Sequence, residues 1–290
     1  MNTDRRPMAV FAMAIVAYLV IIGPFTAYMK RKPMEEKLGY VPNATMLRYV
    51  CADQKAFVGS ALLMKVIMYY GGLMDQPSKK TVATQPDFRG MSNIIHTALK
   101  LDPYNMDGYY FAQSFLTWEV KQFDIANKLL DYGMKYRTWD WYLPFFAGFN
   151  HAYFLKDYKK AAEYYRRAAE LSGEELYASL AGRYMQESGQ TALAIGYLKA
   201  MIASSRNAVA KKSFEARLRA FECVREIESA RDRFWEKNRR QPVSIDELVA
   251  SGFLKAVPRD PYGGQFYLEA DGKVATTSKF AFPLAKQGVK

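Results

Sequence analysis

Few side chains in this 290-residue chain have the types and spacing that catalysis or metal binding requires. The two cysteines, Cys51 and Cys223, lie far apart, which fits neither a disulfide framework nor a metal-binding motif. The two histidines, His96 and His151, leave little for histidine-based catalysis or metal ligation. The sequence shows no glycine-rich phosphate loop, zinc-ligand spacing, nucleophile elbow or convincing acid pair. We therefore predict a protein that is not an enzyme and that uses no cofactor and no metal.

The distribution of charge favours protein and lipid partners over nucleic acid. The formal net charge is +12, of which residues 1–32 carry +4 from five basic residues and one acid. The remaining excess is spread along a long body and lacks the block of Lys and Arg that a nucleic-acid-binding arm needs. We predict a basic surface that lies near anionic lipid headgroups and binds no nucleic acid.

Residues 8–29 form a run of 22 residues without a charge. At a rise of about 1.5 Å per residue, such a helix can cross a hydrocarbon core of about 30 Å. The run is longer than the apolar part of a typical cleaved signal peptide, and no small-x-small pair precedes the basic cluster at residues 30–32. We therefore predict an uncleaved, single-pass membrane anchor. The basic residues on its two sides are almost balanced and slightly favour a cytoplasmic body.

Four segments of the chain share a helical pattern and can be aligned: 87–103, 122–136, 157–173 and 189–202. The pattern they share is a stripe of aromatic, small, bulky and small residues at helical spacing, complete in 122–136 and 157–173. The small residues permit a close approach of a neighbouring helix. Three sets of equivalent positions recur. Phe88, Phe123 and Tyr158 are 35 residues apart, and so are Ala98, Gly133 and Ala168. Ala126, Ala161 and Ala194 follow at intervals of 35 and 33 residues. The spacing predicts an array of similar helix pairs.

This pattern resembles the tetratricopeptide repeat, whose second helix reads roughly aromatic-x-x-Ala-x-x-x-aromatic-x-x-Ala and often ends in Pro. Residues 157–171 match it well, Pro103 supplies the expected proline, and residues 178–184 resemble part of the first helix. Gly133 and Met201 depart from the pattern, and residues 71–86 insert a polar loop. The resemblance covers residues 57–202. It implies a mainly α fold, a tetratricopeptide-like α-solenoid of about four helix pairs, and a role in protein–protein interaction.

Residues 139–154 contain eight aromatic side chains. Pro144, Asn150 and His151 interrupt this run, which is too short for a second membrane span. We predict that it is the first helix of the third repeat unit. Two interpretations stay open for its inward positions and their equivalents, the core of the array or a concave groove for an extended peptide. The candidate groove residues are Phe111, Phe115, Trp118, Phe146, Asn150, Tyr153, Arg183 and Gln186.

Two elements follow the repeats. Residues 211–240 place Phe214, Phe221 and Phe234 at helical spacing among many charged residues, which predicts a capping helix that covers the open end of the array. Further on, Ser244 and Glu247 have capping-box spacing, and the pair 271–272 separates two β-rich runs, 265–269 and 273–277. The end of the chain is therefore predicted to be a small α+β tail with a short helix and a β-hairpin.

The tail is similar to the C-terminal part of the major pseudopilins of type II secretion. The matching residues are Pro258, Asp260, Pro261, Tyr262, Gly263, Tyr267, Asp271, Gly272 and Val274. The chain is no pilin, because it lacks a prepilin cleavage motif and an early Glu in the apolar helix. The resemblance raises a Ca²⁺ role for Asp260 or Asp271, whereas a turn and a hairpin explain two lone carboxylates more simply.

Nearly the whole chain also resembles an uncharacterised group of bacterial membrane-anchored tetratricopeptide proteins, some of them linked to pilus or envelope machinery. The predicted parts are an anchor (1–32), a linker or first helix (33–56), repeats (57–206), a capping helix (207–240) and the tail (241–290). We predict a scaffold or adaptor for cell-envelope, pilus or secretion-type assembly, held in the inner membrane with a periplasmic body. The pseudopilin-like tail favours that side. The alternative is a receptor facing the cytosol in organelle import or assembly, although no carboxylate clamp of Lys and Asn is visible.

Overall fold

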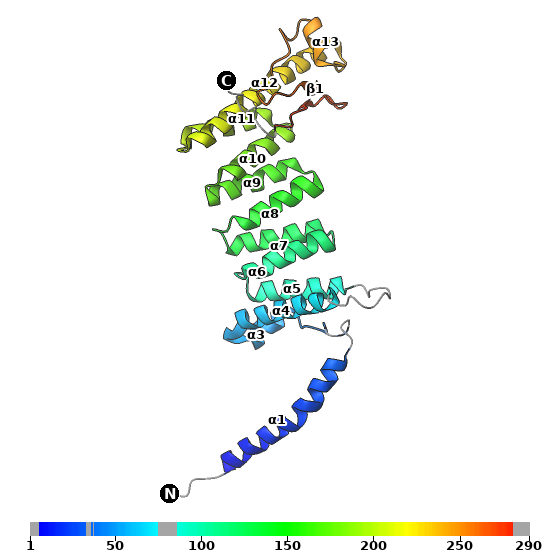
Figure 1. The fold of residues 1–290 in the computed structure, drawn as a ribbon, viewed down its shortest axis with the longest axis vertical. Helices are drawn as coiled ribbons and strands as arrows, with labels where there is room; N and C mark the ends of the chain where they lie inside the picture. The colour runs from blue at the N-terminus through cyan, green and yellow to red at the C-terminus, as the bar shows by residue number, and fades with distance from the viewer. Residues whose placement is uncertain (1–5, 33–35, 37, 75–85, 281–290) are drawn as a thin grey trace, which may run out of the picture. The chain divides into compact units, whose positions relative to one another are not determined.

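The computed structural model describes residues 6–32, 36, 38–74 and 86–280. The chain is mainly helical, as predicted, with one small antiparallel sheet near its C-terminal end (Figure 1). It divides into two compact units, residues 1–115 and 116–290. Most of the polar loop predicted at 71–86 lies outside the described residues.

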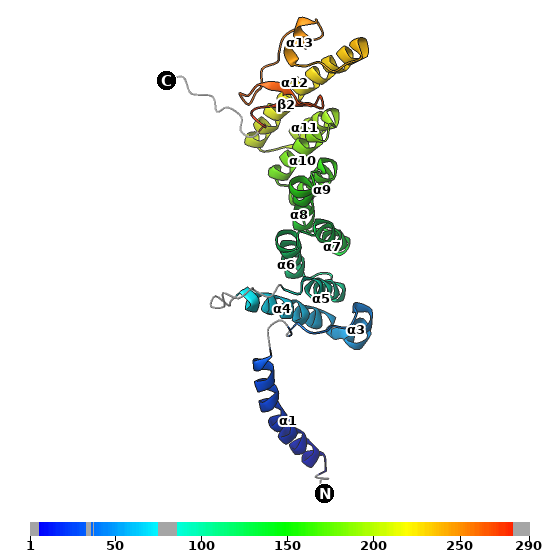
Figure 2. The same ribbon diagram turned by 90° about the vertical axis from the view of Figure 1, so that its right-hand side faces the viewer.

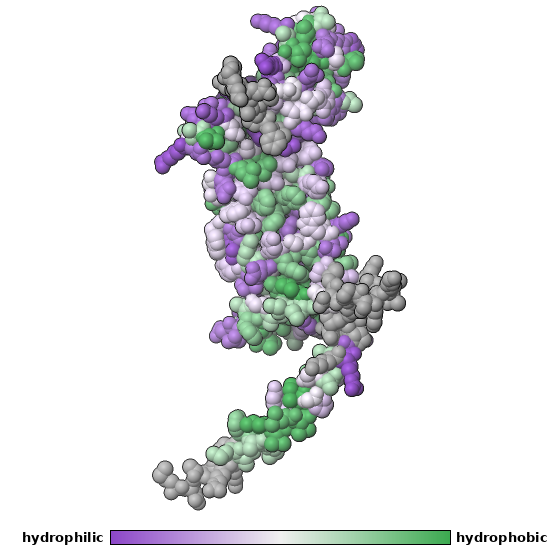
Figure 3. All heavy atoms as spheres, viewed as in Figure 1, coloured by the Kyte–Doolittle hydropathy of each residue, from purple (hydrophilic) through white to green (hydrophobic). Residues whose placement is uncertain are grey.

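The first unit begins with the apolar helix α1, Arg6–Arg31. Its segment Met8–Met29 is long and apolar enough to cross a membrane, and none of it is buried by the rest of the chain. Hydrophobic colour follows most of its length in Figure 3. A second helical segment, Ala52–Leu73, satisfies the same criteria of length and hydropathy but is partly buried.

The rest of the first unit is a packed set of short helices: α3 (Ala44–Val50), the 3-10 turn η1 (Ala52–Gln54), α4 (Lys55–Met74), α5 (Phe88–Leu101) and α6 (Met106–Ser114). Asn43, Asp87 and Asn105 cap three of them by accepting backbone N–H bonds of 2.8–2.9 Å. α4 lies along α5 in close contact. A Cβ added to Gly59 of α4 would lie 3.0 Å from the carbonyl oxygen of Ala98, so this approach favours glycine.

The second unit is a succession of helices that pack on their neighbours in chain order. They are α7 (Phe123–Tyr136), α8 (Tyr142–Asn150), α9 (Tyr158–Ser172), α10 (Glu175–Glu187), α11 (Thr191–Ser204), α12 (Ala208–Asn238) and α13 (Ile245–Ala250). Two π-helical turns occur at equivalent places: η2 (Phe115–Glu119) follows α6, and η3 (His151–Leu155) follows α8. The aromatic-rich segment 139–154 is therefore helical over most of its length, as predicted.

The predicted recurrence is confirmed in the positions of the helices. Phe88, Phe123 and Tyr158 are the first residues of α5, α7 and α9. The next positions of the stripe are fully buried in all four helices: Met91, Ala126, Ala161 and Ala194. The turns before α7, α9 and α11 also match, because Lys121, Lys156 and Gly189 all have positive φ, at 55°, 56° and 79°. Helices α5, α7 and α9 thus begin at equal intervals along the chain.

The tail contains the predicted short helix and hairpin. Ser244 caps α13 by accepting from the backbone N–H of Glu247 at 3.2 Å. Strands β1 (Phe266–Leu268) and β2 (Val274–Thr276) pair antiparallel, with Phe266 opposite Thr276. The hairpin turn has Gly272 at a φ of +83°, a conformation that glycine adopts without steric cost.

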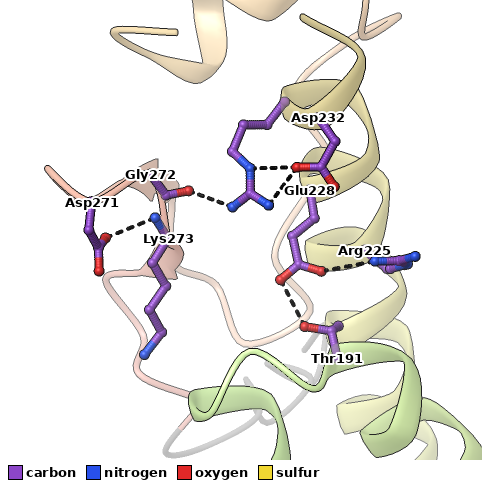
Figure 4. A network of polar contacts seen from close by, with 8 residues as sticks. Thr191, Arg225, Glu228, Asp232, Asp271, Gly272 and Lys273 are labelled. Carbon is purple, nitrogen blue, oxygen red and sulfur yellow. Dashed lines mark hydrogen bonds and ion pairs between the residues drawn. The ribbon is translucent and has the colours of Figure 1, made fainter. Parts of the chain in front are cut away.

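The long helix α12 carries the tail on its surface, as Figure 2 shows for the hairpin. Their shared core contains Phe221, Val224 and Phe234 of α12 together with Leu248, Tyr262, Phe266 and Val274 of the tail. Polar contacts add to this packing (Figure 4). Arg231 donates to the carbonyl oxygen of Gly272 at 2.7 Å, and the buried Glu228 accepts from the Thr191 hydroxyl at 2.8 Å.

Candidate functional site

Two of the predicted groove residues, Phe111 and Phe115, belong to the first unit. Phe115 is buried, and its ring is parallel to that of Phe111 with 6.0 Å between the centroids. It also contacts Tyr70 and Phe88, in each case with 5.7 Å between ring centroids. Phe115 is therefore a core residue of the first unit, and Phe111 is half-buried beside it.

In the second unit, two of the candidate groove residues are buried, which agrees with the core interpretation for these two. Asn150 is 0 % exposed, and its side-chain amide donates to the Asn127 side-chain oxygen at 2.9 Å. Gln186 is also buried. Helical spacing placed both residues on the inward stripe, but neighbouring side chains cover that stripe where the helices approach closely. The Asn150 side chain is not available to a partner at the surface, and Gln186, although buried, borders a small hollow.

Trp118 and Tyr153 do lie on an open surface, where they are 54 % and 57 % exposed. They belong to a cluster of five aromatic residues that we name the aromatic face: Trp118, Phe123, Phe149, Tyr153 and Phe154. The Phe154 ring joins its parts, because it lies edge-on to Trp118 at 5.2 Å and stacks on Phe123 at 4.4 Å. Phe149 stacks on Tyr153 at 5.4 Å. The exposed rings are thus held by ring contacts on their inner sides.

The π-helical turn η3 explains why Tyr153 is exposed and Asn150 is not. The two residues are three positions apart, a spacing that would put them on the same side of a regular α-helix. The turn begins at His151, where the wider π spacing replaces the 3.6-residue repeat. Residues after Asn150 are therefore rotated relative to the α-helical expectation, and Tyr153 reaches the surface.

Two small hollows are lined in part by residues of α10, and we name them the α10 hollows. The first has a volume of about 220 Å³ and is lined by Ala152, Tyr153, Lys156, Tyr158, Arg183, Tyr184 and Glu187. The second, of about 160 Å³, shares Arg183 and Glu187 and adds Gln186 and residues of the hairpin, among them Tyr267 and Lys273. Tyr153 therefore belongs both to the aromatic face and to the first hollow.

The charges around the α10 hollows are mainly positive. The Lys156 ammonium lies 5.3 Å from the centre of the Tyr153 ring, and the Arg183 guanidinium lies 5.8 Å from that of Tyr184. Glu187 is paired with Lys273 at 2.7 Å. Arg183 is half-buried, and its Nε has no hydrogen-bond partner among the described residues. A ligand carboxylate would find positive charge here, whereas the Arg183 Nε itself is buried.

The titratable side chains behind this surface stay neutral near pH 7. Burial raises the pKa of the Tyr184 phenol, so this ring presents a neutral hydroxyl. Burial lowers the pKa of His151, and this effect exceeds the opposing attraction of Asp157. His151 stacks on Tyr164 with 5.4 Å between ring centroids and is buried. It acts as a core residue.

Sequence reasoning missed Phe149, Phe154, Lys156, Tyr184 and Lys273 as members of this surface. Phe154 and Lys156 lie just before the repeat position Tyr158, and their proximity to that position was a usable signal. Lys273 reaches the surface only because the hairpin packs beside α10, and no spacing in the sequence reports that contact. Phe146 is half-buried, and its ring contacts Tyr142 and Phe145.

The carboxylates considered for Ca²⁺ hold turns of the tail. Asp260 is buried and accepts from the Tyr262 backbone N–H at 2.8 Å and from the hydroxyls of Ser278 and Thr276. Asp271 accepts from the Lys273 backbone N–H at 2.9 Å. Within the described residues, no group of three or more His, Cys, Asp or Glu side chains is placed to hold a metal ion.

Comparisons with known proteins do not assign a function. No protein-family model matches the chain, and no curated protein matches it. The chemistry of the aromatic face and the α10 hollows is therefore the basis for a functional proposal.

Proposed function

We propose that the protein is a membrane-anchored scaffold of the tetratricopeptide type that binds an extended segment of a partner protein. Two features support a repeat scaffold: helices begin at equivalent residues, and the stripe facing their neighbours is buried throughout. Stacked helix pairs create long surfaces, and proteins built from them use these surfaces to bind peptides.

The observation that carries the proposal is the exposure of Trp118 and Tyr153 beside a cationic hollow. Large aromatic side chains are enriched among the residues that dominate binding energy at protein interfaces. Their rings are already fixed by Phe149 and Phe154, so little conformational entropy is lost on binding. Lys156 and Arg183 add selectivity for negative charge. The ligand that fits is an extended peptide with an apolar side chain for the aromatic face and an acidic side chain for the first hollow.

The proposed location is the inner membrane, with a single pass through α1 and a periplasmic body that binds envelope, pilus or secretion components. The length and hydropathy of α1 support the anchor. The tail supports the periplasmic side through its pseudopilin-like turn and hairpin. A cysteine at the exposed Glu236, in a chain with Cys51 and Cys223 replaced by Ser, tests the topology. A membrane-impermeant maleimide should label it in spheroplasts before lysis, and labelling only after lysis would reverse the proposed orientation.

Peptide binding is tested with the full-length protein in detergent and two synthetic peptide libraries. One library combines aromatic with acidic residues, and the other combines aromatic with basic residues. We expect the acidic library to bind preferentially, and Trp118→Ala with Tyr153→Ala to weaken its binding at least tenfold. Arg183→Glu should remove the preference for acidic peptides. Leu193→Ala is the matched control, because Leu193 is equally exposed in the same unit but lies outside the aromatic face. Equal binding by the double variant and the control would refute the proposed surface.

A further inference from the structure

The helix α4 has two apolar sides, and the described residues of the chain cover only one of them. Gly59, Leu63, Val66 and Tyr69 are buried on the side that faces α5. A second stripe follows intervals of four and three residues and is exposed at every position. We name it the α4 outer face: Phe57, Ala61, Met64, Met68 and Gly71. Phe57 is 72 % exposed and Met68 is 66 % exposed. The α4 outer face contains no charged residue, since Lys55 and Lys65 are the only charges in this helix.

The preceding helix adds further exposed apolar side chains. α3 leads into α4 through η1 and lies next to its first turn in both ribbon views (Figures 1 and 2). Its Met46, Tyr49 and Val50 are exposed, Tyr49 to 84 %. Hydrophobic atoms accordingly gather over α3 and α4 in Figure 3. A contiguous apolar surface of this kind on a folded chain marks a contact with another body.

The length of chain between α1 and α3 limits what this other body can be. α1 ends at Arg31, and Asn43 caps α3 twelve residues later. A fully extended chain of that length spans at most about 40 Å. If α1 crosses a bilayer, as proposed above, α3 and the start of α4 can never leave the neighbourhood of its headgroups. The bilayer is therefore the apolar body that this surface always meets, whatever the protein concentration.

The composition around the surface fits a lipid headgroup region. Residues 30–74 contain seven basic and three acidic residues, a balance that favours anionic lipids. Tyr40 and Tyr49 are both strongly exposed, and tyrosine is enriched where a membrane meets water. Met64, Met68 and Phe57 supply the apolar side chains that an in-plane amphipathic helix inserts below the headgroups.

We propose that α3 and the α4 outer face lie in the interface of the bilayer that α1 crosses, with α4 parallel to the membrane plane. This inference rests on the proposed anchor. An in-plane position is favoured over a second membrane crossing because the opposite side of α4 is packed on α5. α5 exposes Arg89, Asn93 and Lys100, and a spanning α4 would draw these polar side chains into hydrocarbon. A second copy of the chain is the less favoured occupant, because it would have to be met by association, whereas the short tether after α1 holds α3 and the start of α4 beside the bilayer at all times.

Depth-dependent fluorescence quenching of the full-length chain tests the inference. Single cysteines replace Met68, Asn93 or Val16 in a chain with Cys51→Ser and Cys223→Ser, and each carries a bimane label. The protein is reconstituted in vesicles of phosphatidylcholine and phosphatidylglycerol that contain lipids spin-labelled at a shallow or a deep acyl position. We expect the label at 68 to lose about half of its fluorescence with the shallow quencher and less with the deep one. The label at 93 should be unaffected, and the label at 16 should respond most to the deep quencher.

Each other outcome has a separate meaning. Deep quenching at 16 without quenching at 68 overturns the inference and leaves the proposed anchor standing. No quenching at 16 refutes the anchor itself. Stronger deep than shallow quenching at 68 would make α4 a second span, and self-quenching between labels at 68 without lipid quenching would assign the face to a second copy; both overturn the inference.

A variant with charges on the α4 outer face tests the same inference by weakening the contact with lipid. Met64→Glu with Met68→Glu places two charges on exposed positions of α4, so the fold should be preserved. With a label at Ala61→Cys, we expect these changes to reduce shallow quenching several-fold. Asn93→Glu is the control and should leave quenching at 61 unchanged. Equal quenching in both variants overturns the inference.

Discussion

The helices α4 and α12 differ in how many of their apolar side chains are buried. In α12, Phe221, Val224, Ile227 and Phe234 are fully buried, because α11 and the tail both pack on this helix. In α4, one apolar stripe is buried and a second one is exposed throughout. Both helices carry more apolar surface than a single neighbour can cover. Among the described residues, α12 receives a second cover from the tail, whereas the outer face of α4 receives none.

The tail owes its position on α12 to a small number of directed contacts as well as to apolar packing. Asp260 joins the turn at Tyr262 to the end of β2, and Arg231 joins α12 to the hairpin turn. No such element covers the α4 outer face among the described residues. The comparison indicates that an apolar helix face can be assigned to an outside contact only when the neighbours of that helix within the chain are known.

The largest difference is expected between Val224→Asp and Met68→Asp. Val224 is fully buried, so an aspartate there is an unpaired charge in the core and should cost at least about 3–5 kcal/mol of stability. Met68 is exposed, and the same change should alter stability by less than about 0.5 kcal/mol in detergent. Differential scanning calorimetry of both full-length variants measures this difference. Similar losses in the two variants would show that the α4 outer face is covered within the chain.

An intermediate effect is expected for Asp260→Ala, which leaves the tail without its central acceptor. Hydrogen bonds to a buried carboxylate contribute about 1.5–3 kcal/mol, so a loss of about that size is expected. Hydrogen exchange should become faster at residues 262–278 and stay unchanged in α4. Asp260→Asn is the control, because its amide oxygen can still accept from the Tyr262 N–H. If Asp260→Ala left exchange in the tail unaltered, packing alone would hold the tail on α12.

The smallest effect is expected for Glu228→Gln, which tests the polar side of α12. Burial raises the pKa of Glu228, and the bond from Thr191 and the nearby Arg231 and Arg225 only partly oppose this rise. Because the folded pKa lies above the unfolded one, the folded state disfavours the carboxylate. Stability is therefore lost as pH rises from the ordinary pKa of glutamate, about 4.3, through the raised value.

Glutamine removes this charge and can still accept from Thr191. We expect a Tm higher than that of the parent by at most about 2 °C at pH 7, with the difference disappearing below pH 4. Thermal unfolding at several pH values measures this difference. A lower Tm of the variant at pH 7 would mean that attraction to the two arginines outweighs the cost of burial.

Local patterns in the sequence predicted the elements well. The aromatic and small residues at 35-residue intervals predicted where α5, α7 and α9 begin, because the same stripe packs on a neighbour in each case. Turn residues predicted the hairpin and the capping of α13. These features depend on residues close together in the chain or on one repeated contact.

The proposed binding surface was harder to predict because it depends on contacts between residues far apart in the sequence. Asn150 and Tyr153 are three positions apart, so a regular α-helix would put both side chains on the same side. The π-helical turn is the reason that Asn150 is buried and Tyr153 is exposed. Lys273 joins this surface through its contact with Glu187, a residue 86 positions earlier in the chain. In the sequence, the exposed stripe of α4 cannot be told from the buried one, because both are apolar. Only the packing of α5 shows which stripe is covered.

The turns before α7, α9 and α11 have one further consequence. Gly189 adopts its left-handed backbone freely, whereas Lys121 and Lys156 hold the same conformation with a Cβ present, which is strained by roughly 1–2 kcal/mol. A glycine would relieve that strain but would leave no long side chain at the joint. At Lys156 the strained joint places an ammonium group over the Tyr153 ring, so this joint combines a local loss of stability with a positive charge beside the first α10 hollow.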